Sequence, residues 1–191
     1  MRRVDKTIYL HSVGNLEKSV LLNLKTDLNM AFRDLNISVE TKPDSLELSD
    51  FEYNASWAQY NAAKILKKLE QHMKLKNYYR ILGVTEEDIF TEGLNFVFGV
   101  AKKPFNPYES IASLISVCRL REEFYNHNED QELFRLRVLK EAVHELGHTF
   151  SLGHCDNRCV MRFSNSLRQT DEKPPTFCDT CYLKIQKFLS R

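Results

Sequence analysis

The sequence lacks the features that would direct the chain to nucleic acid or to a membrane. It has no excess of either charge, because 27 Lys and Arg residues against 26 Asp and Glu residues give a net charge of +1. No strong electrostatic field therefore attracts it to nucleic acid or to an acidic membrane surface. It also has no run of about 20 apolar residues, which a membrane helix needs, and its N-terminal apolar stretch is too short for the hydrophobic core of a signal peptide. We expect a cytoplasmic protein.

The sequence has no internal repeat and no low-complexity segment, and its 191 residues are the length of one domain. Runs rich in β-branched and aromatic residues predict strands over 6–13, 36–42, 79–84, 94–101 and 112–120. Apolar residues at helical spacing predict helices over 16–33, 57–75 and 131–150. Because the two patterns alternate, we predict a mixed α/β fold with one sheet, in a single domain over 1–191.

Cysteines are few, but they are clustered near the C-terminus. Four of the five are Cys155, Cys159, Cys178 and Cys181, and the fifth, Cys118, lies alone in an apolar run. In a reducing cytosol such C-x-n-C spacing indicates metal binding more often than disulfides. The sequence therefore predicts a four-cysteine metal site over 155–181, with free thiols or two disulfides as the alternative.

The helix predicted over 131–150 carries the residues that indicate catalysis. Asn128 or Asp130 can cap its N-terminus. His144 and His148, four residues apart, lie on one face of a helix and can share one zinc ion. Glu145 between them can reach a water at the metal instead of the metal itself. The alternative is a pair of core histidines on an amphipathic helix, but a third histidine ten residues after the first makes that alternative weak.

That third histidine, His154, requires a change in backbone direction. In an unbroken helix it would lie about 9 Å along the axis from His148 and could not bind the same ion. We therefore predict that the chain leaves the helix over 151–153. Gly153 or Ser151 would then adopt a positive φ.

The stretch HELGHTFSLGHC, residues 144–155, resembles the zinc signature HExxHxxGxxHC of the archaemetzincins, a family of metzincin-like zinc metallopeptidases. In that family the third histidine runs into a cysteine cluster, here Cys155-x3-Cys159-x-Met161-x16-Cys178-x2-Cys181. Two of these gaps are one residue shorter than the usual pattern, and Ser151 replaces the glycine of the signature. The resemblance implies a metzincin-like domain with a mixed, mostly parallel twisted sheet. It also implies that Met161 forms a hydrophobic floor beneath the catalytic ion.

Ligand chemistry predicts two zinc ions, because the seven candidate ligands exceed what one ion takes. Three neutral imidazoles leave zinc its full charge, enough to bring water to a pKa near 7, whereas four thiolates make a closed site that is a poor Lewis acid. We therefore assign a catalytic ion to His144, His148 and His154. A structural ion is assigned to Cys155, Cys159, Cys178 and Cys181.

These features together predict a zinc metallopeptidase with Glu145 as general base. The resemblance implies that a peptide substrate lies along an edge strand, by chain order the segment 94–101. We expect a monomer that binds neither nucleic acid nor membrane, and the sequence leaves endopeptidase and aminopeptidase action equally open. The alternative is a non-catalytic zinc protein that acts as an interaction module. Glu145 argues against it, since a purely structural histidine site needs no adjacent carboxylate.

Overall fold

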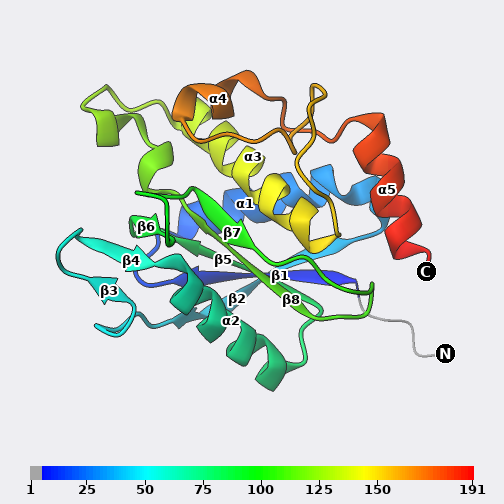
Figure 1. Ribbon diagram of the computed structural model, residues 1–191, viewed down its shortest axis with the longest axis horizontal. Helices are drawn as coiled ribbons and strands as arrows, with labels where there is room; N and C mark the ends of the chain where they lie inside the picture. The colour runs from blue at the N-terminus through cyan, green and yellow to red at the C-terminus, as the bar shows by residue number, and fades with distance from the viewer. Residues whose placement is uncertain (1–5) are drawn as a thin grey trace.

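The computed structural model describes residues 6–191, and a five-stranded sheet forms its centre (Figure 1). The strand order is β2-β1-β5-β8-β7, in which the first four strands are parallel and β7 runs antiparallel along β8 at one edge. The bounds are β1 Thr7–Val13, β2 Ser38–Leu46, β5 Arg80–Thr85, β7 Gly99–Ala101 and β8 Ile111–Ser116. The predicted mixed, mostly parallel sheet is confirmed.

Three very short strands form a second, small sheet beside the first. Its order is β3-β4-β6, with β3 at Tyr53–Asn54, β4 at Gln59–Asn61 and β6 at Ile89–Phe90. None of these three strands was predicted, and β4 lies within the range predicted as helix. Strands of two or three residues carry too little alternation for a sequence pattern to be recognised.

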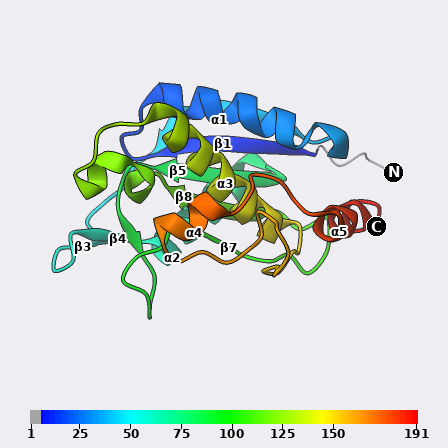
Figure 2. The same cartoon turned by 90° about the horizontal axis from the view of Figure 1, so that it is seen from above.

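Helices cover both faces of the main sheet (Figures 1 and 2). One face packs against α1 (Lys18–Ala31) and α3 (Gln131–Thr149), and α5 (Asp179–Leu189) joins the same core. The other face packs against α2 (Ala62–Lys76). The short helix α4 (Leu167–Glu172) lies next to α3. Strands β5 and β8 are buried along their whole length, as strands covered on both faces should be.

Several predicted elements were wrong in extent. The strand predicted over 36–42 continues to Leu46, and the strand predicted over 112–120 ends at Ser116, before a 3₁₀ helix at Cys118–Leu120. The strand predicted over 94–101 is a strand only over 99–101, because the chain before it turns toward the small sheet, where the Val97 amide donates to the Ile89 carbonyl. The helix predicted from residue 57 begins at Ala62. Ala58 has a φ of 52°, which no right-handed helix allows, and the Asn61 side chain caps the helix by accepting from the Lys64 amide.

The last turn of α3 is fixed to the sheet by a buried arginine. Arg80, at the start of β5, is fully buried, and its guanidinium donates to the Thr149 carbonyl at 3.0 Å. This hydrogen bond satisfies one of the carbonyls left open at a helix C-terminus, where a positive charge is also favourable. The helix end that carries His148 is thereby tied to the central strands. Among residues 6–191, no helix is long and apolar enough to cross a membrane.

Candidate functional site

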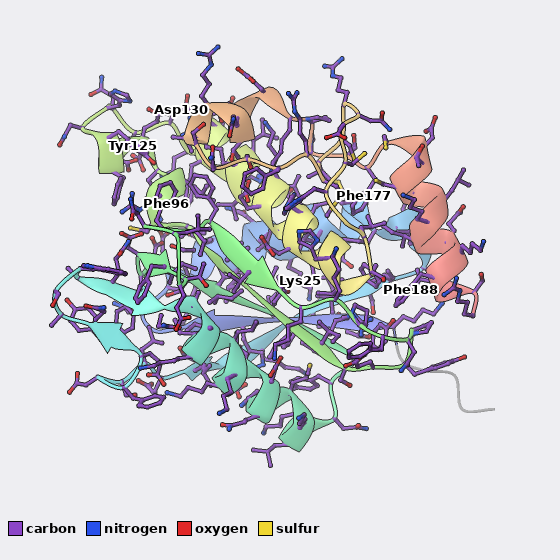
Figure 3. All side chains as sticks on the ribbon, in the orientation of Figure 1. Lys25, Phe96, Tyr125, Asp130, Phe177 and Phe188 are labelled. Atoms are coloured by element: carbon purple, nitrogen blue, oxygen red, sulfur yellow. The ribbon has the colours of Figure 1, made fainter. Side chains whose placement is uncertain are left out.

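Helix α3 presents the predicted histidine pair at its buried C-terminal half. Asp130 caps the helix by accepting from the Leu133 amide at 2.9 Å, so of the two predicted caps Asp130 is the one used (Figure 3). His144 and Glu145 are buried, and Thr149 is the last helical residue. The predicted helix is therefore confirmed to within one residue.

The imidazoles of His144 and His148 are oriented by backbone carbonyls. The Nδ1 of His144 lies 2.9 Å from the Val160 carbonyl oxygen, and the Nδ1 of His148 lies 3.0 Å from that of Leu152. With each Nδ1 donating, both Nε2 atoms are left free to accept a metal, which is the usual arrangement around histidine ligands. These two Nε2 atoms are 3.2 Å apart. Two ligands on one tetrahedral zinc, each about 2.0–2.1 Å from the ion, are about 3.3 Å apart, so the geometry fits that ion.

His154 joins this pair because the backbone bends sharply after the helix. Ser151 has a φ of 67°, whereas Gly153 is not in the left-handed region, so Ser151 makes the predicted turn. The Leu152 amide donates back to the Gly147 carbonyl, as in a Schellman C-cap. The His154 ring centroid is consequently 5.4 Å from that of His144, and one ligand nitrogen from each of the three histidines lies within 4.8 Å of the others.

All three imidazoles are held in the neutral form that metal binding requires. Burial lowers the pKa of His144 to about 3, with the Lys173 charge acting in the same direction. Burial also lowers the pKa of His148 and of His154, and Lys103 contributes to both. At neutral pH the proton therefore does not compete with a metal for these nitrogens.

The three histidines line a cleft along the edge strand β7. The cleft has a volume of about 450 Å³. It is lined by the segment 94–101, by the three histidines with Glu141 and Glu145, and by Phe163, Ser164 and Asn165. Phe96, which precedes β7 (Figure 3), is one of these lining residues. Among the described residues, no Tyr or Arg lines this cleft, so the structure adds no candidate of either type for stabilising an oxyanion.

Glu145 extends from α3 toward β7, into space that a glycine leaves free. A Cβ atom on Gly99 would lie only 2.6–2.9 Å from the Glu145 side chain, closer than real Cβ atoms approach. Burial raises the pKa of Glu145 well above its ordinary value, the Glu141 carboxylate raises it further, and Lys173 opposes both. Sequence reasoning did not single out Gly99, because only the packed structure shows what faces its backbone.

A buried ion pair also supports the site, and sequence reasoning missed it. The ammonium of Lys173 lies 2.9 Å from the Glu141 carboxylate, and both side chains are almost completely buried. The same ammonium donates to Ser164 at 3.0 Å, and the Thr170 hydroxyl donates to Glu141. This network connects α3 to the loop that lines the cleft.

Met161 packs against α3 at Gly147, and the role that the resemblance implied for it, a hydrophobic floor beneath the catalytic ion, stays a prediction. Gly147 allows this approach, because its Cβ would lie 2.3 Å from the Met161 sulfur. Met161 is fully buried, and its carbonyl accepts from the Cys155 amide at 3.0 Å. The loop that carries Met161 and Val160 thus supports both the helix and the His144 ring.

The four predicted cysteines converge into a second candidate metal site. Their sulfur atoms all lie within 4.8 Å of one another, and the Sγ atoms of Cys155 and Cys178 are 3.8 Å apart. That distance excludes a disulfide of about 2.05 Å and equals the separation of about 3.8 Å expected for two sulfurs on a tetrahedral zinc. All five cysteines of the chain, each within the described residues, are free, so the disulfide alternative is wrong.

The environments of these thiols differ, and one of them is acidic. Burial opposes ionisation of Cys178, but hydrogen bonds from the Cys181 backbone and from Asn157 outweigh it and lower its pKa to about 6. Burial raises the pKa of Cys159 and of Cys181. A thiolate at Cys178 among three neighbouring thiols is a soft donor set that fits zinc.

Comparisons with known proteins agree with this geometry. The family model described as peptidase family M54 matches residues 7–187. The archaemetzincin of Sulfolobus acidocaldarius is 37% identical over 180 residues, which are 93% of this chain and 95% of the relative. The archaemetzincin of Pyrococcus furiosus is 38% identical over 182 residues, 94% of this chain and 92% of that relative.

Solved structures give the same result. The archaemetzincin of Archaeoglobus fulgidus, in complex with malonate, aligns with a TM-score of 0.75 at 38% identity, over 93% of this chain and 99% of that one. A zinc-dependent peptidase from Methanocorpusculum labreanum aligns with a TM-score of 0.80 at 26% identity, with the same coverage of both chains. None of these findings favours the non-catalytic alternative. The chain therefore belongs to peptidase family M54, the archaemetzincins, and is a zinc-dependent metallopeptidase.

Proposed function

We propose that His144, His148 and His154 hold the catalytic zinc ion and that Glu145 is the general base. The arrangement of the two helical histidines supports this proposal most strongly: each Nδ1 is hydrogen-bonded to a carbonyl, and the free Nε2 atoms are 3.2 Å apart. A zinc ion there would supply Lewis acidity, polarising the substrate carbonyl and acidifying water.

Glu145 performs the proton transfers in this proposal. Its carboxylate takes a proton from the attacking water as the water oxygen bonds to the carbonyl carbon, and it gives that proton to the amine when the C–N bond breaks. It lines the same cleft as the three histidines and is buried against Gly99. Burial favours its protonated form, and an ion of charge +2 nearby would favour the carboxylate. These opposed effects suit a group that must both accept and release a proton.

The substrate backbone is proposed to pair with β7. This strand is at the edge of the sheet, it borders the cleft, and its three residues are half-buried. A peptide added to this edge would form main-chain hydrogen bonds, the mode known as β-augmentation. The strand covers 99–101 and not the whole predicted segment. The residues before it, which include Phe96, line the cleft and are therefore proposed to contact substrate side chains.

Cys155, Cys159, Cys178 and Cys181 are proposed to hold a second, structural zinc ion. A site with four cysteine ligands is closed to water and contributes to folding instead of catalysis. We also propose that the protein is a monomer of one domain. It would act in the reducing cytoplasm, where its thiols remain available to bind metal.

Zinc content and peptide hydrolysis test the proposal together. The chain purified without chelator should contain two zinc ions and should hydrolyse members of a random peptide library. A chelator that removes the histidine-bound ion should abolish hydrolysis, and added zinc should restore it. One ion per chain, or hydrolysis that persists after both ions are removed, would reject the two-ion assignment.

Gly99→Ala should lower peptide hydrolysis by at least about tenfold without loss of zinc. The added methyl group would lie within 3 Å of the Glu145 side chain, so the carboxylate must move, and small misplacements of reacting groups are costly to catalysis. Gly93→Ala is the control: this glycine has no atom within 4 Å of the added Cβ, although its φ of 84° adds some strain. Equal activity of Gly99→Ala and wild type would show that Glu145 need not occupy this position.

A further inference from the structure

A second histidine cluster lies on the face of the sheet opposite α3. It consists of His11 on β1, Asp44 on β2 and His72 on α2, and one possible ligand atom from each lies within 4.8 Å of the others. Helix α2 covers this face of the sheet, whereas α3 and the peptidase cleft lie on the other (Figure 1). The cluster is therefore separate from the histidine and cysteine groups described above.

A bulge in β2 brings the carboxylate to the histidine. Leu10 pairs with Thr41 and Ser12 pairs with Ser45. His11 alone is thus opposite the three residues 42–44 of its neighbour. Such an irregularity bends a strand and re-aims its side chains, and bulges are common beside functional sites.

His11 is buried, being 1% exposed, and His72 is half-buried. Within the described residues, the Nε2 atom of each is buried without a hydrogen-bond partner. The His72 Nε2 is 3.6 Å from an Asp44 carboxylate oxygen. That distance is too long for a hydrogen bond, but it is near the separation of about 3.4 Å between a nitrogen and an oxygen ligand on one tetrahedral zinc. Buried polar atoms without partners are uncommon, and an unseen ion is one of the recognised reasons for them.

The charges around the cluster leave His11 able to act as a ligand. Burial lowers the pKa of His11 to about 4, and His72 and Lys42 act in the same direction against Asp44. At neutral pH the imidazole is neutral, with a lone pair to donate. The Lys42 ammonium is the opposing feature, since it repels a cation, but it lies over the rings of Tyr9 and Tyr78, 4.5 and 5.3 Å from their centroids.

We propose that His11, Asp44 and His72 form an additional metal site that takes a divalent first-row transition ion such as zinc. Two imidazoles and one carboxylate suit these ions and not calcium or magnesium, which prefer all-oxygen sites. Asp44 is exposed, which gives an ion a route of entry. A bound ion would connect α2 to the edge strand β2 and stabilise this side of the domain. Because Asp44 is exposed and Lys42 repels a cation, this site should bind zinc less tightly than the cysteine site. It should therefore fill only when zinc is added to the purified protein.

The zinc content of the full chain at a buffered free-zinc concentration tests the proposal. Wild type should bind one ion more per chain than His72→Gln and Asp44→Asn, and added zinc should raise its melting temperature more than theirs. His127→Gln is the matched control, because His127 is an exposed histidine that also contacts a carboxylate, that of Glu122, outside the cluster. It should keep the wild-type count. Peptide hydrolysis should be unchanged in all three variants.

Equal zinc counts in wild type and His72→Gln, at a concentration that saturates wild type, would overturn the proposal. Anomalous scattering from zinc-soaked wild-type crystals is a second test that needs no variant. It should show a peak between His11 and His72, and peaks confined to the other two groups would overturn the proposal. This test compares the zinc content of wild type with that of the variants. If the assignment of the other two ions is wrong, the zinc content of every protein changes by the same amount, and the difference between wild type and His72→Gln remains.

Discussion

Glu145→Gln should lower peptide hydrolysis by about 10²- to 10⁴-fold, the usual contribution of a general base, and leave the zinc content unchanged. The amide has nearly the shape of the carboxylate, so it fits the space beside Gly99 without the cavity that alanine would leave. It cannot accept the proton of the attacking water. Metal binding should persist because the three histidines, with one nitrogen each within 4.8 Å of the others, provide a donor set without it. Mass spectrometry of a peptide-library digest measures hydrolysis, and elemental analysis measures zinc.

Glu132→Gln is the matched control for this change. Glu132 is an exposed residue in the first turn of the same helix, so the same substitution there should keep both activity and zinc. If Glu145→Gln lost the histidine-bound ion, Glu145 would be a ligand. Full activity in Glu145→Gln with both ions present would exclude it as the base.

The sequence was sufficient to predict the parts of the site that depend on local spacing. His144 and His148 lie four residues apart on a helix that the sequence pattern predicted to within one residue, so their shared face follows from helix geometry. The need for a bend before His154 also follows from that geometry. Helix geometry did not determine which residue makes the bend. Ser151 adopts the positive φ, although glycine would do so at lower cost.

Features that depend on contacts between distant segments could not be predicted. Glu141 in α3 pairs with Lys173 after α4, although each residue has oppositely charged neighbours nearer in the sequence. Gly99 matters for the site because the Glu145 side chain approaches its backbone. His11 lies next to His72 because α2 packs on the face of the sheet that carries His11. The predicted strand over 94–101 failed for the same reason, since pairing with Ile89 diverts its first half. Apolar composition alone does not distinguish a strand from a buried loop.

Cys178→Ser should destabilise the fold much more than His148→Ala. Structural zinc contributes an apparent binding free energy of about 10–16 kcal/mol in small zinc domains, comparable with the whole stability of about 5–15 kcal/mol of a domain. The cysteine group connects the chain after His154 to the start of α5, whose N-cap residue is Cys178. A hydroxyl is a poor substitute for a thiolate ligand. We therefore expect a lower melting temperature, or no cooperative unfolding, by circular dichroism.

Cys118→Ser is the matched control for this substitution. Cys118 is a half-buried cysteine outside the cluster, and no group of possible metal ligands among the described residues includes it. Its replacement should lower the melting temperature only slightly and leave the zinc content at the wild-type value. A large loss of zinc in this control would mean that cysteine replacement in general, and not loss of the cluster, causes the effect.

Loss of the cysteine site should also cause loss of the histidine-bound ion, whereas loss of the histidine site should leave the cysteine site intact. The loop between Cys159 and Met161 supplies the Val160 carbonyl that orients His144, and Met161 supports the helix beneath Gly147. If Cys178→Ser releases that loop, His144 loses its orientation, so the variant should lose the histidine-bound ion as well. His148→Ala removes a ligand from a preformed helix and should keep the cysteine-bound ion. Equal melting temperatures of the two variants, or a Cys178→Ser protein that retains the histidine-bound zinc, would show that the cysteine group does not support the catalytic site.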